Sequence, residues 1–539
     1  MQWVWAMSDC KVWAFALGAE RGALRRQANV GAFRCLAGFA LRLHSPTLSA
    51  AVLLLAAEAA AQPIDVARLA AVGQVNPRYQ SYNVEMVEVT GGRFWKPYRL
   101  GPPRDASDRY AFRPPLDLGN PRLRRLAAAL GPAYVRVSGT WASSTYIAPQ
   151  GVDKAPDGFN QRLTPDQWRG VADFVRAVKG QLVLSAPTSA GTRGPGGVWR
   201  PDQLEALLGL SRDMQVPVAG VAFMNEPNLV SGSGAPAGYT IADYARDYAA
   251  FATAMRSAVP HVRILGPGAV GGLDLETLAA AAGLKVLPMR ALAAARPAVD
   301  VYTYHHYGAQ SQRCATSGPL ATRQSDGLDP AWLERTDATL NFHKKLRDES
   351  APGAPIWVTE TAQAACGGSP WAATFADTPR YVDQLGRLAR GGVSAVFHNT
   401  LAASDYALLD ERDFAPRPNY WAALIWARLM GATVLHAPSK LTAFRVYAHC
   451  LKGVPGGVAL VGVNLGSAPV PLSFAGAGKA WSLADNGLGA VRVNGTVPKL
   501  GPKDWLPRLD GVAVVGEATV APAGVTFVAL PQAGAAACV

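Results

Sequence analysis

Two glutamates stand directly after short apolar runs that are typical of buried strands. Glu226 lies in the tripeptide Asn225-Glu226-Pro227, after the run at 218–224, and Glu360 follows the run at 355–359. A pair of carboxyl groups can hydrolyse a glycosidic bond when one gives a proton to the leaving oxygen and the other attacks the anomeric carbon. The two glutamates are candidates for this chemistry, provided that the fold brings them face to face.

The neighbours of the glutamates predict which carboxyl group takes which role. Asn225 can reach a sugar 2-hydroxyl, an interaction that strengthens in an oxocarbenium-like transition state, and Pro227 fixes the turn that presents Glu226. Tyr307, which ends another strand-like run, can donate a hydrogen bond to Glu360 and hold it ionised. We expect Glu226 to be the general acid/base and Glu360 the nucleophile, about 5–5.5 Å apart as in retaining enzymes.

Each of these signals also has a simpler interpretation. The Asn-Glu-Pro tripeptide is a plausible strand-end turn, and a glutamate that closes a strand is usually just solvated. His305 and His306 are more readily packed, hydrogen-bonded side chains than metal ligands, because no third ligand is spaced for zinc. We therefore expect no metal and no cofactor. Two glutamates at the ends of the fourth and seventh strands of an eight-strand pattern favour a catalytic barrel over a non-catalytic glycan-binding barrel.

The elements that must position these residues alternate regularly through residues 77–435. The expected strands are 81–89, 133–137, 181–186, 218–224, 262–265, 299–305, 355–359 and 393–398. The expected helices are 121–130, 164–178, 201–214, 241–258, 275–282, 330–347, 375–390 and 419–430. Such strict alternation predicts an α/β fold, a closed (β/α)8 TIM barrel, whose catalytic residues lie at the carboxyl ends of the strands.

The pattern changes at residue 436. Short apolar runs separated by Gly, Pro and Asn turns, without a helical period between them, predict an appended β-sandwich over 436–539. These runs are 443–449, 457–464, 470–474, 491–493, 512–515 and 525–530. We expect the segment 62–76 to join this domain.

The first 61 residues have the features of an export signal and an upstream leader. Arg42 precedes the apolar run 48–57, and Ala59-Ala60-Ala61 is a small-residue cleavage pattern, which predicts a cut near Ala61 and a secreted or periplasmic protein. The run is too short for a comfortable membrane span. A membrane-anchored structural protein would require this segment to stay uncleaved.

The charge of the chain limits its partners. The formal net charge is +13, which favours acidic partners such as nucleic acid, anionic lipid or sulfated glycan, or simply reflects a soluble surface. The basic residues are scattered, without an aromatic-interleaved basic stripe, so we expect no nucleic-acid binding. We expect the protein to be a monomer.

At these residues the sequence resembles the heparanase-like glycoside hydrolases, family 79 of clan A. The resemblance runs from Ser81-Tyr82-Asn83-Val84-Glu85 to the C-terminus and is strongest over residues 357–435. The stretches that carry it include Glu360-Thr361, Gly367-Gly368, Asp405-Tyr406, Asp410-Glu411, Asn419-Tyr420-Trp421, Arg445-Val446-Tyr447-Ala448-His449-Cys450 and Ala537-Cys538. The resemblance implies a barrel with a β-sandwich, retaining chemistry and a β-linked glucuronic acid before the cleaved bond.

The resemblance also implies roles for individual residues. It gives Glu226 and Glu360 the same roles as above, and Asn225, Glu85 and Thr140 contacts to the sugar hydroxyls. Tyr406 and the backbone N–H groups near Gly367 and Gly368 become a clamp on the uronate carboxylate, which is physically reasonable because a glycine turn can wrap an anion closely.

Two departures from the family pattern affect substrate preference. The animal enzymes carry a lysine-rich cluster shortly after the second strand, whereas residues 139–157 here hold only Lys154, which puts a preference for heparan sulfate in doubt. Cys366 takes the place of the first glycine of the carboxylate turn, where a backbone N–H still remains. We also expect a single active chain, because the excised linker of animal proenzymes has no evident counterpart.

Four cysteines lie beyond the expected signal. The resemblance implies a disulfide between Cys450 and Cys538. Cys314 and Cys366 follow adjacent strands of the predicted barrel, so they are either a second disulfide that braces the active-site loops or two separate buried thiols.

Together these observations predict a secreted retaining β-glucuronidase of heparanase type. We expect it to hydrolyse β-glucuronic acid linkages inside a heparan sulfate-like polysaccharide by double displacement. The alternative with the same chemistry is an exo-β-glucuronidase that trims plant or microbial glycans. The two activities are distinguished by the length of the loops around the subsite for the sugar that precedes the glucuronic acid.

Overall fold

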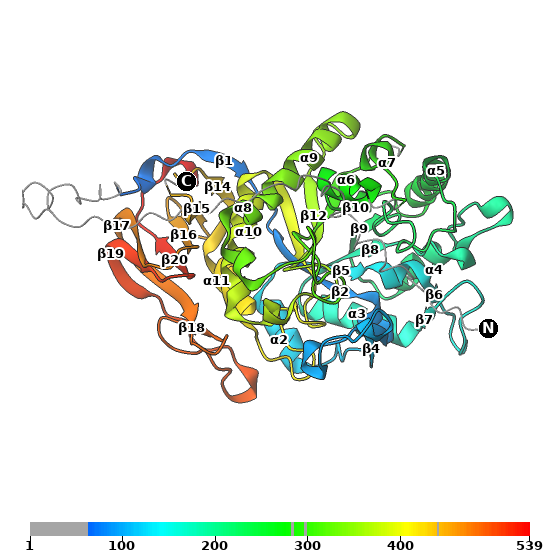
Figure 1. The fold of residues 1–539 in the computed structure, drawn as a ribbon, viewed down its shortest axis with the longest axis horizontal. Coiled ribbons are helices and arrows are strands. Elements are labelled where there is room, and N and C mark those ends of the chain that lie inside the picture. Colours follow the sequence, from blue (N-terminus) through cyan, green and yellow to red (C-terminus); the bar gives the residue numbers. More distant parts are fainter. Residues whose placement is uncertain (1–62, 282–284, 296–298, 439–440) are drawn as a thin grey trace, which may run out of the picture. The chain divides into compact units, whose positions relative to one another are not determined.

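The structure is a computed structural model that describes residues 63–281, 285–295, 299–438 and 441–539 (Figure 1). The expected export signal, its apolar run at 48–57 and the cleavage pattern at Ala59-Ala60-Ala61 lie outside the described residues.

Eight parallel strands close into a barrel, which confirms the predicted fold class. Each strand is short, and most of its residues are buried, as in a barrel whose interior is filled by side chains. In order around the barrel the strands are β2 (Gln80–Glu85), β5 (Tyr134–Ser138), β8 (Gln181–Ser185), β9 (Val218–Ala222), β10 (Arg263–Val270), β11 (Val301–His306), β12 (Ile356–Thr361) and β13 (Val393–His398).

Helices connect the barrel strands and begin where their capping residues stand. Thr164 and Thr240 each form a capping box, with Gln167 and Asp243 respectively. The helices are α2 (Pro121–Ala129), α3 (Pro165–Ala177), α4 (Asp202–Asp213), α5 (Ile241–Ala258), α6 (Leu273–Ala281), α7 (Met289–Ala295), α8 (Pro330–Leu333), α9 (Arg335–Ser350), α10 (Thr378–Arg390) and α11 (Pro418–Leu429).

The first strand ends earlier than the sequence predicted. The expected strand 81–89 stops at Glu85, and Met86–Thr90 forms the short helix α1 instead. The side chain of Glu88 accepts a hydrogen bond from the backbone N–H of Glu85 at 2.6 Å, which caps the helix and outweighs the β-propensity of its two valines. A hairpin that the sequence did not predict follows, made of β3 (Gly92–Trp95) and β4 (Tyr110–Arg113).

A second domain consists of one eight-stranded sheet that is antiparallel throughout. Its strands are β1 (Ala71–Gln74), β14 (Met430–Leu435), β15 (Phe444–Leu451), β16 (Val458–Asn464), β17 (Val470–Asp485), β18 (Val491–Val493), β19 (Val512–Val520) and β20 (Val525–Leu530). β1 comes from the N-terminal side of the barrel and pairs with β14, as its position beside the C-terminal strands shows (Figure 1). β14 begins directly after α11, ahead of the boundary expected at residue 436, because Gly431 lets it approach the backbone of Cys450, where a Cβ would meet the carbonyl oxygen at 2.5 Å.

The central strands of this sheet are buried on both faces. On β16, Ala459 and Val461 belong to the same core as the barrel helices, whereas Val458 and Leu460 pack with Leu472 and other residues of the β-domain. Alternate residues of one strand therefore serve two cores, as the period of two along a strand requires.

The β-domain is attached to the barrel through α10, which lies between the barrel strands and the sheet (Figure 1). The hydroxyl of Tyr447 on β15 donates a hydrogen bond of 2.6 Å to Asp383 on α10, and Arg387 contacts the same carboxylate at 2.5 Å. Gly386 lies beneath the Tyr447 ring, where a Cβ would come within 2.3 Å. This close approach positions the helix, and with it the strands on either side.

Two disulfides are present. Cys450 joins Cys538 at a Cα–Cα distance of 5.3 Å, and Cys314 joins Cys366 at 6.4 Å. The first ties the C-terminal segment to β15, and the second links the loops that follow β11 and β12.

We predict that removal of the Cys450–Cys538 disulfide destabilises the protein. The disulfide spans 88 residues, and opening a loop of that length lowers the free energy of unfolding by about 4.6 kcal/mol in the chain-entropy model. The double variant Cys450→Ala/Cys538→Ala is compared with the parent in guanidinium unfolding without reductant. An unchanged unfolding midpoint would contradict the stabilising role of this disulfide.

Candidate active site

The two predicted glutamates face each other at the carboxyl ends of the barrel strands. Glu226 follows β9 and Glu360 lies near the end of β12. One oxygen of each carboxyl group, together with a ring nitrogen of His305, lies within 4.8 Å of the others. Their side chains are 15% and 10% exposed, so both are mostly shielded yet reachable from the barrel mouth.

Glu226 is presented by an unusual backbone conformation. Its φ is 48°, in the left-handed region that non-glycine residues rarely adopt. The side chain of the preceding residue, Asn225, is 97% buried and accepts a hydrogen bond of 2.8 Å from Arg136. Fixed neighbours of this kind hold a strained residue in place, and such strain is common at functional sites.

Arg136 is the cation at the centre of the site, and the sequence analysis did not identify it. It stands on β5, its side chain is 4% exposed, and its guanidinium contacts Glu360 at 2.9 Å as well as Asn225. A charged residue in the middle of the apolar strand Tyr134–Ser138 was the available signal, because an arginine is almost never fully buried without a partner.

His305 and Tyr307 complete the contacts to the two carboxyl groups. His305 Nδ1 lies 2.9 Å from Glu226 and 3.6 Å from Glu360. The hydroxyl of Tyr307 donates the predicted hydrogen bond to Glu360, at 2.6 Å. Asn399, which follows β13, donates to the hydroxyl oxygens of Tyr307 and Tyr406 at 2.9 and 3.0 Å, and thereby orients both rings.

The environment separates the pKa values of the two glutamates. Burial, reinforced by the negative charge of Glu360, raises the pKa of Glu226 above its usual value, although its hydrogen bond to His305 opposes this. Burial would also raise the pKa of Glu360, but the positive charges of His305 and Arg136 and the Tyr307 hydrogen bond outweigh it and lower that pKa. The carboxyl group of Glu360 therefore loses its proton more readily than that of Glu226, which is the order that acid and nucleophile chemistry requires.

Besides Asn225, the residues expected to contact sugar hydroxyls lie at the ends of the neighbouring strands β2 and β5. Glu85 ends β2 and is 3% exposed, and its burial together with the charge of Glu360 raises its pKa well above the usual value. Gly139, after β5, faces it, and a Cβ there would lie 1.5 Å from a Glu85 carboxylate oxygen. Thr140 follows and is exposed. The carboxyl group of Glu85 therefore depends on a glycine at 139.

The residues of the expected carboxylate clamp form a compact turn in the loop after β12. Cys366, Gly367 and Gly368 all have positive φ, at 61°, 80° and 78°. Their carbonyl oxygens accept hydrogen bonds from side chains that include Arg313 and Ser404. Within the described ranges, no group accepts a hydrogen bond from the N–H groups of the two glycines.

Tyr406 packs directly against this turn. A Cβ on Gly368 would meet the Cβ of Tyr406 at 2.8 Å, so the glycine allows the ring to approach. Tyr406 itself is 2% exposed, and burial raises the pKa of its hydroxyl well above the usual value, which keeps the proton in place as a hydrogen-bond donor.

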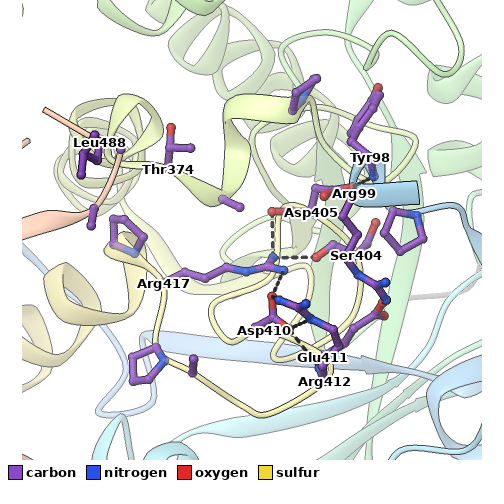
Figure 2. A pocket seen from close by; sticks show the side chains of 18 residues that line it. Tyr98, Arg99, Thr374, Ser404, Asp405, Asp410, Glu411, Arg412, Arg417 and Leu488 are labelled. Atoms are coloured by element: carbon purple, nitrogen blue, oxygen red, sulfur yellow. Dashed lines mark hydrogen bonds and ion pairs between the residues drawn. The ribbon is translucent and has the colours of Figure 1, made fainter. Parts of the chain in front are cut away.

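A pocket of about 480 Å³ lies behind the loop that carries Tyr406, and neither catalytic candidate lines it. Arg417 extends along it and donates hydrogen bonds to the carbonyl oxygens of Ser404 and Asp405, at 2.7 and 2.9 Å, while its other nitrogen lies 3.5 Å from Asp410 (Figure 2). Arg313, which holds the glycine turn, also pairs with the Asp405 side chain. Arg417 therefore fixes the loop at Ser404 and Asp405, and Arg313 joins this loop to the glycine turn.

The charge around the central groups does not favour a metal ion. Glu226, His305 and Glu360 place donor atoms within 4.8 Å of one another, which an ion could bridge. The guanidinium of Arg136 already contacts Glu360, however, and its positive charge opposes a second cation at this distance. The arrangement is better suited to proton transfer and nucleophilic attack.

Comparison with known proteins relates the chain to heparanases. No protein-family model matches it. A heparanase-like protein of Arabidopsis thaliana is 37% identical over 172 residues, which cover 31% of this chain and 30% of the relative. The heparanase of Bos taurus is 34% identical over 157 residues, covering 28% and 27%. The baicalin-β-D-glucuronidase of Scutellaria baicalensis is 28% identical over 254 residues, covering 44% and 46%. The chain is similar to heparanases over these segments. It spans less than half the length of these relatives.

Solved structures share the fold of this heparanase-like chain. A 4-O-α-L-rhamnosyl-β-D-glucuronidase from Fusarium oxysporum superposes with a TM-score of 0.60 at 13% identity, covering 87% of this chain and 99% of the other. A family 51 α-L-arabinofuranosidase from Thermotoga petrophila gives a TM-score of 0.58 at 12% identity, covering 85% and 98%. At such identities the similarity concerns the fold alone. None of the helices in the described ranges is long and apolar enough to cross a membrane.

We predict that Tyr307→Phe shifts the acid limb of the pH–activity profile of this heparanase-like chain to higher pH. The hydroxyl stabilises the ionised form of Glu360, so its loss raises the pKa of that carboxyl group. The profile of kcat/KM against pH reports this change. Tyr304→Phe is the matched control, because the buried hydroxyl of Tyr304 has no hydrogen-bond partner among the described residues. A profile unchanged by Tyr307→Phe would contradict the role of Tyr307.

Proposed function

We propose that this heparanase-like chain is a retaining β-glucuronidase that hydrolyses β-glucuronic acid linkages in a polysaccharide. The observation that carries the proposal is that Arg136 and Tyr307 contact Glu360, whereas His305 contacts the facing Glu226. The opposite displacement of the pKa values of the two glutamates agrees with these contacts. Their closest approach, within 4.8 Å, agrees with the separation of about 5–5.5 Å in retaining enzymes and is too short for the water that inverting enzymes place between the two groups.

In the first step, Glu360 attacks the anomeric carbon and forms an ester with the sugar. The bond from that carbon to the leaving oxygen breaks as Glu226 gives this oxygen its proton. The side chain of Asn225 lies beside both groups, where it can bind the 2-hydroxyl. Arg136 and Tyr307 orient Glu360 and keep it ionised until it attacks.

In the second step, the same residues work in reverse. Once Glu360 is an ester it carries no negative charge, so the pKa of Glu226 falls and its ionised carboxylate can accept a proton from water. The water oxygen bonds to the anomeric carbon, and the ester to Glu360 breaks. This leaves Glu226 protonated and Glu360 ionised, as both were before the first step.

The glycine turn supports a uronic acid as the sugar before the cleaved bond. The free N–H groups of Gly367 and Gly368 and the hydroxyl of Tyr406 can donate to a carboxylate, and backbone donors held by a rigid turn bind an anion without a balancing charge. Two relatives named heparanase or β-glucuronidase agree with this assignment. A heparan sulfate-like glycan cut internally is our first candidate substrate.

An exo-β-glucuronidase is the second candidate. The observation that favours it is the similarity to the relative from Scutellaria baicalensis, which is named for the glucuronide baicalin. Both candidates use the same two glutamates and the same clamp. They differ only in whether the surface beside the carboxylate turn accepts a preceding sugar or is closed to it. The two disulfides support a protein that acts outside the reducing cytosol, in a secreted or periplasmic location.

The two catalytic residues make distinguishable predictions. Glu360→Gln should abolish turnover of every glucuronide, because an amide cannot form the glycosyl ester. Glu226→Gln should strongly slow hydrolysis of natural linkages, yet preserve the first step on a glucuronide with a good leaving group, which needs little protonation. Pre-steady-state release of the leaving group measures that step. Equal losses of the two variants on the activated substrate would contradict the assignment.

The carboxylate clamp is tested by Tyr406→Phe. We expect glucuronides to lose transition-state binding by roughly 1.5–3 kcal/mol, the range for a charge-assisted hydrogen bond, while the matching glucosides lose far less. The measurement is kcat/KM for the two aryl glycosides with the parent and the variant. Equal losses on both would show that Tyr406 does not contact the carboxylate.

A further inference from the structure

Three aromatic side chains form a partly exposed cluster at the rim of the barrel, here called the aromatic platform: Trp95, Tyr110 and Trp141. The rings of Trp95 and Tyr110 are stacked with centroids 4.7 Å apart, and Trp141 stands edge-on to them at 6.2 and 6.3 Å. Phe94, only 2% exposed, lies 4.8 Å from Trp141 and anchors the cluster to the core. Each ring of the platform keeps part of its surface in solvent.

The platform lies between the carboxylate turn and the loop that faces Glu85, the two features that hold the sugar in the proposed site. On one side, a Cβ on Gly367 would come within 2.7 Å of the Cβ of Trp95, so this tryptophan packs on the carboxylate turn. On the other side, Trp141 follows Thr140 and Gly139, which faces Glu85. The indole N–H of Trp141 donates to the Arg93 carbonyl at 3.0 Å and ties β3 to this loop.

The cations near the platform are already engaged. Lys96 pairs with Asp108 at 2.8 Å, and Arg93 donates to two backbone carbonyl oxygens at 3.2 Å. Arg99 pairs with Glu411 at 3.1 Å, and Arg113 lies between buried or half-buried carboxylates. This part of the rim therefore offers aromatic surface to a ligand, and most of its cations already contact a carboxylate.

We propose that the aromatic platform binds the neutral sugar that precedes the cleaved glucuronate. In a hexuronic acid the carbon that bears the carboxylate adjoins carbon 4, and in a 1→4-linked chain the preceding sugar is attached there. The ring next to the carboxylate clamp is therefore the preceding sugar, and the apolar C–H face of a pyranose packs well on an aromatic surface. The assignment rests on the proposed function for the position of the carboxylate, and it makes the enzyme one that grips internal, weakly sulfated segments.

The test measures binding separately from activity. Calorimetry with the inactive Glu360→Gln protein uses two probes, an unsulfated octasaccharide of alternating glucuronic acid and N-acetylglucosamine and its fully sulfated counterpart. We expect the unsulfated probe to bind more tightly, and Trp141→Ala in the same background to weaken its binding roughly tenfold. Trp141→Phe, which keeps an aromatic ring, should recover most of the loss.

Matched variants keep this test decisive. Phe112→Ala on the same hairpin removes an aromatic ring that is 76% exposed and outside the platform, and binding should not change. If Trp141→Ala does not fold, Tyr110→Ala removes a platform ring without breaking the indole hydrogen bond and should weaken binding similarly. Unaltered affinity in the folded variants, or tighter binding of the sulfated probe, would overturn the platform.

A second substrate separates this proposal from the proposed function. β-D-Glucuronyl fluoride has no preceding sugar, so its hydrolysis by the parent protein depends on the catalytic pair and the clamp alone. Hydrolysis of the fluoride with no platform-dependent binding of the octasaccharide would overturn the platform and leave the β-glucuronidase intact, with the aromatic rings as a wall that restricts it to chain ends. Platform-dependent binding without hydrolysis of the fluoride would overturn the proposed function instead.

Discussion

The site depends on one constraint, which is that two carboxyl groups lie within 4.8 Å of each other in a largely buried place. At that distance like charges cannot both be ionised at low energetic cost, so the surroundings must decide which group keeps its proton. Arg136 and Tyr307 contact Glu360 and stabilise its negative charge, whereas the hydrogen bond with His305 and the charge of Arg136 do not offset the burial of Glu226. The chemistry follows from this unequal distribution of partners.

The barrel makes that distribution possible, because the partners come from several different strands. Arg136 stands on β5, His305 on β11, Glu360 on β12 and Asn399 after β13, and the parallel arrangement brings these strand ends to one rim. The β-domain contributes from outside. It packs on α10 through Tyr447, and the helix in turn fixes the strands that carry Glu360 and Asn399. The contacts behind the glycine turn, including the Cys314–Cys366 disulfide and Arg313, hold the carboxylate clamp in the same way.

The sequence predicted those parts of the molecule that local patterns determine. Alternating strand and helix periods gave the barrel, and Glu226 and Glu360 followed from their places at strand ends. Arg136 was missed because its partners are distant in the chain, and a single arginine in an apolar strand leaves the hydrophobic pattern intact. The hairpin of β3 and β4 was missed because its strands are only four residues each, with a long connection, and the strand predicted through Val89 had concealed the capping box at Glu85. The start of β14 was also missed, because helix α11 passes into it without a turn.

The most direct test of the account is to trap the covalent intermediate with 2-deoxy-2-fluoro-β-D-glucuronyl fluoride. The fluorine at carbon 2 slows both steps by destabilising the oxocarbenium-like transition states, while the fluoride leaving group needs no proton, so the ester accumulates. The account predicts time-dependent inactivation and, by mass spectrometry of a protease digest, a single sugar adduct on the peptide that contains Glu360. An adduct on Glu226, or hydrolysis of glucuronides without any adduct on Glu360, would contradict it.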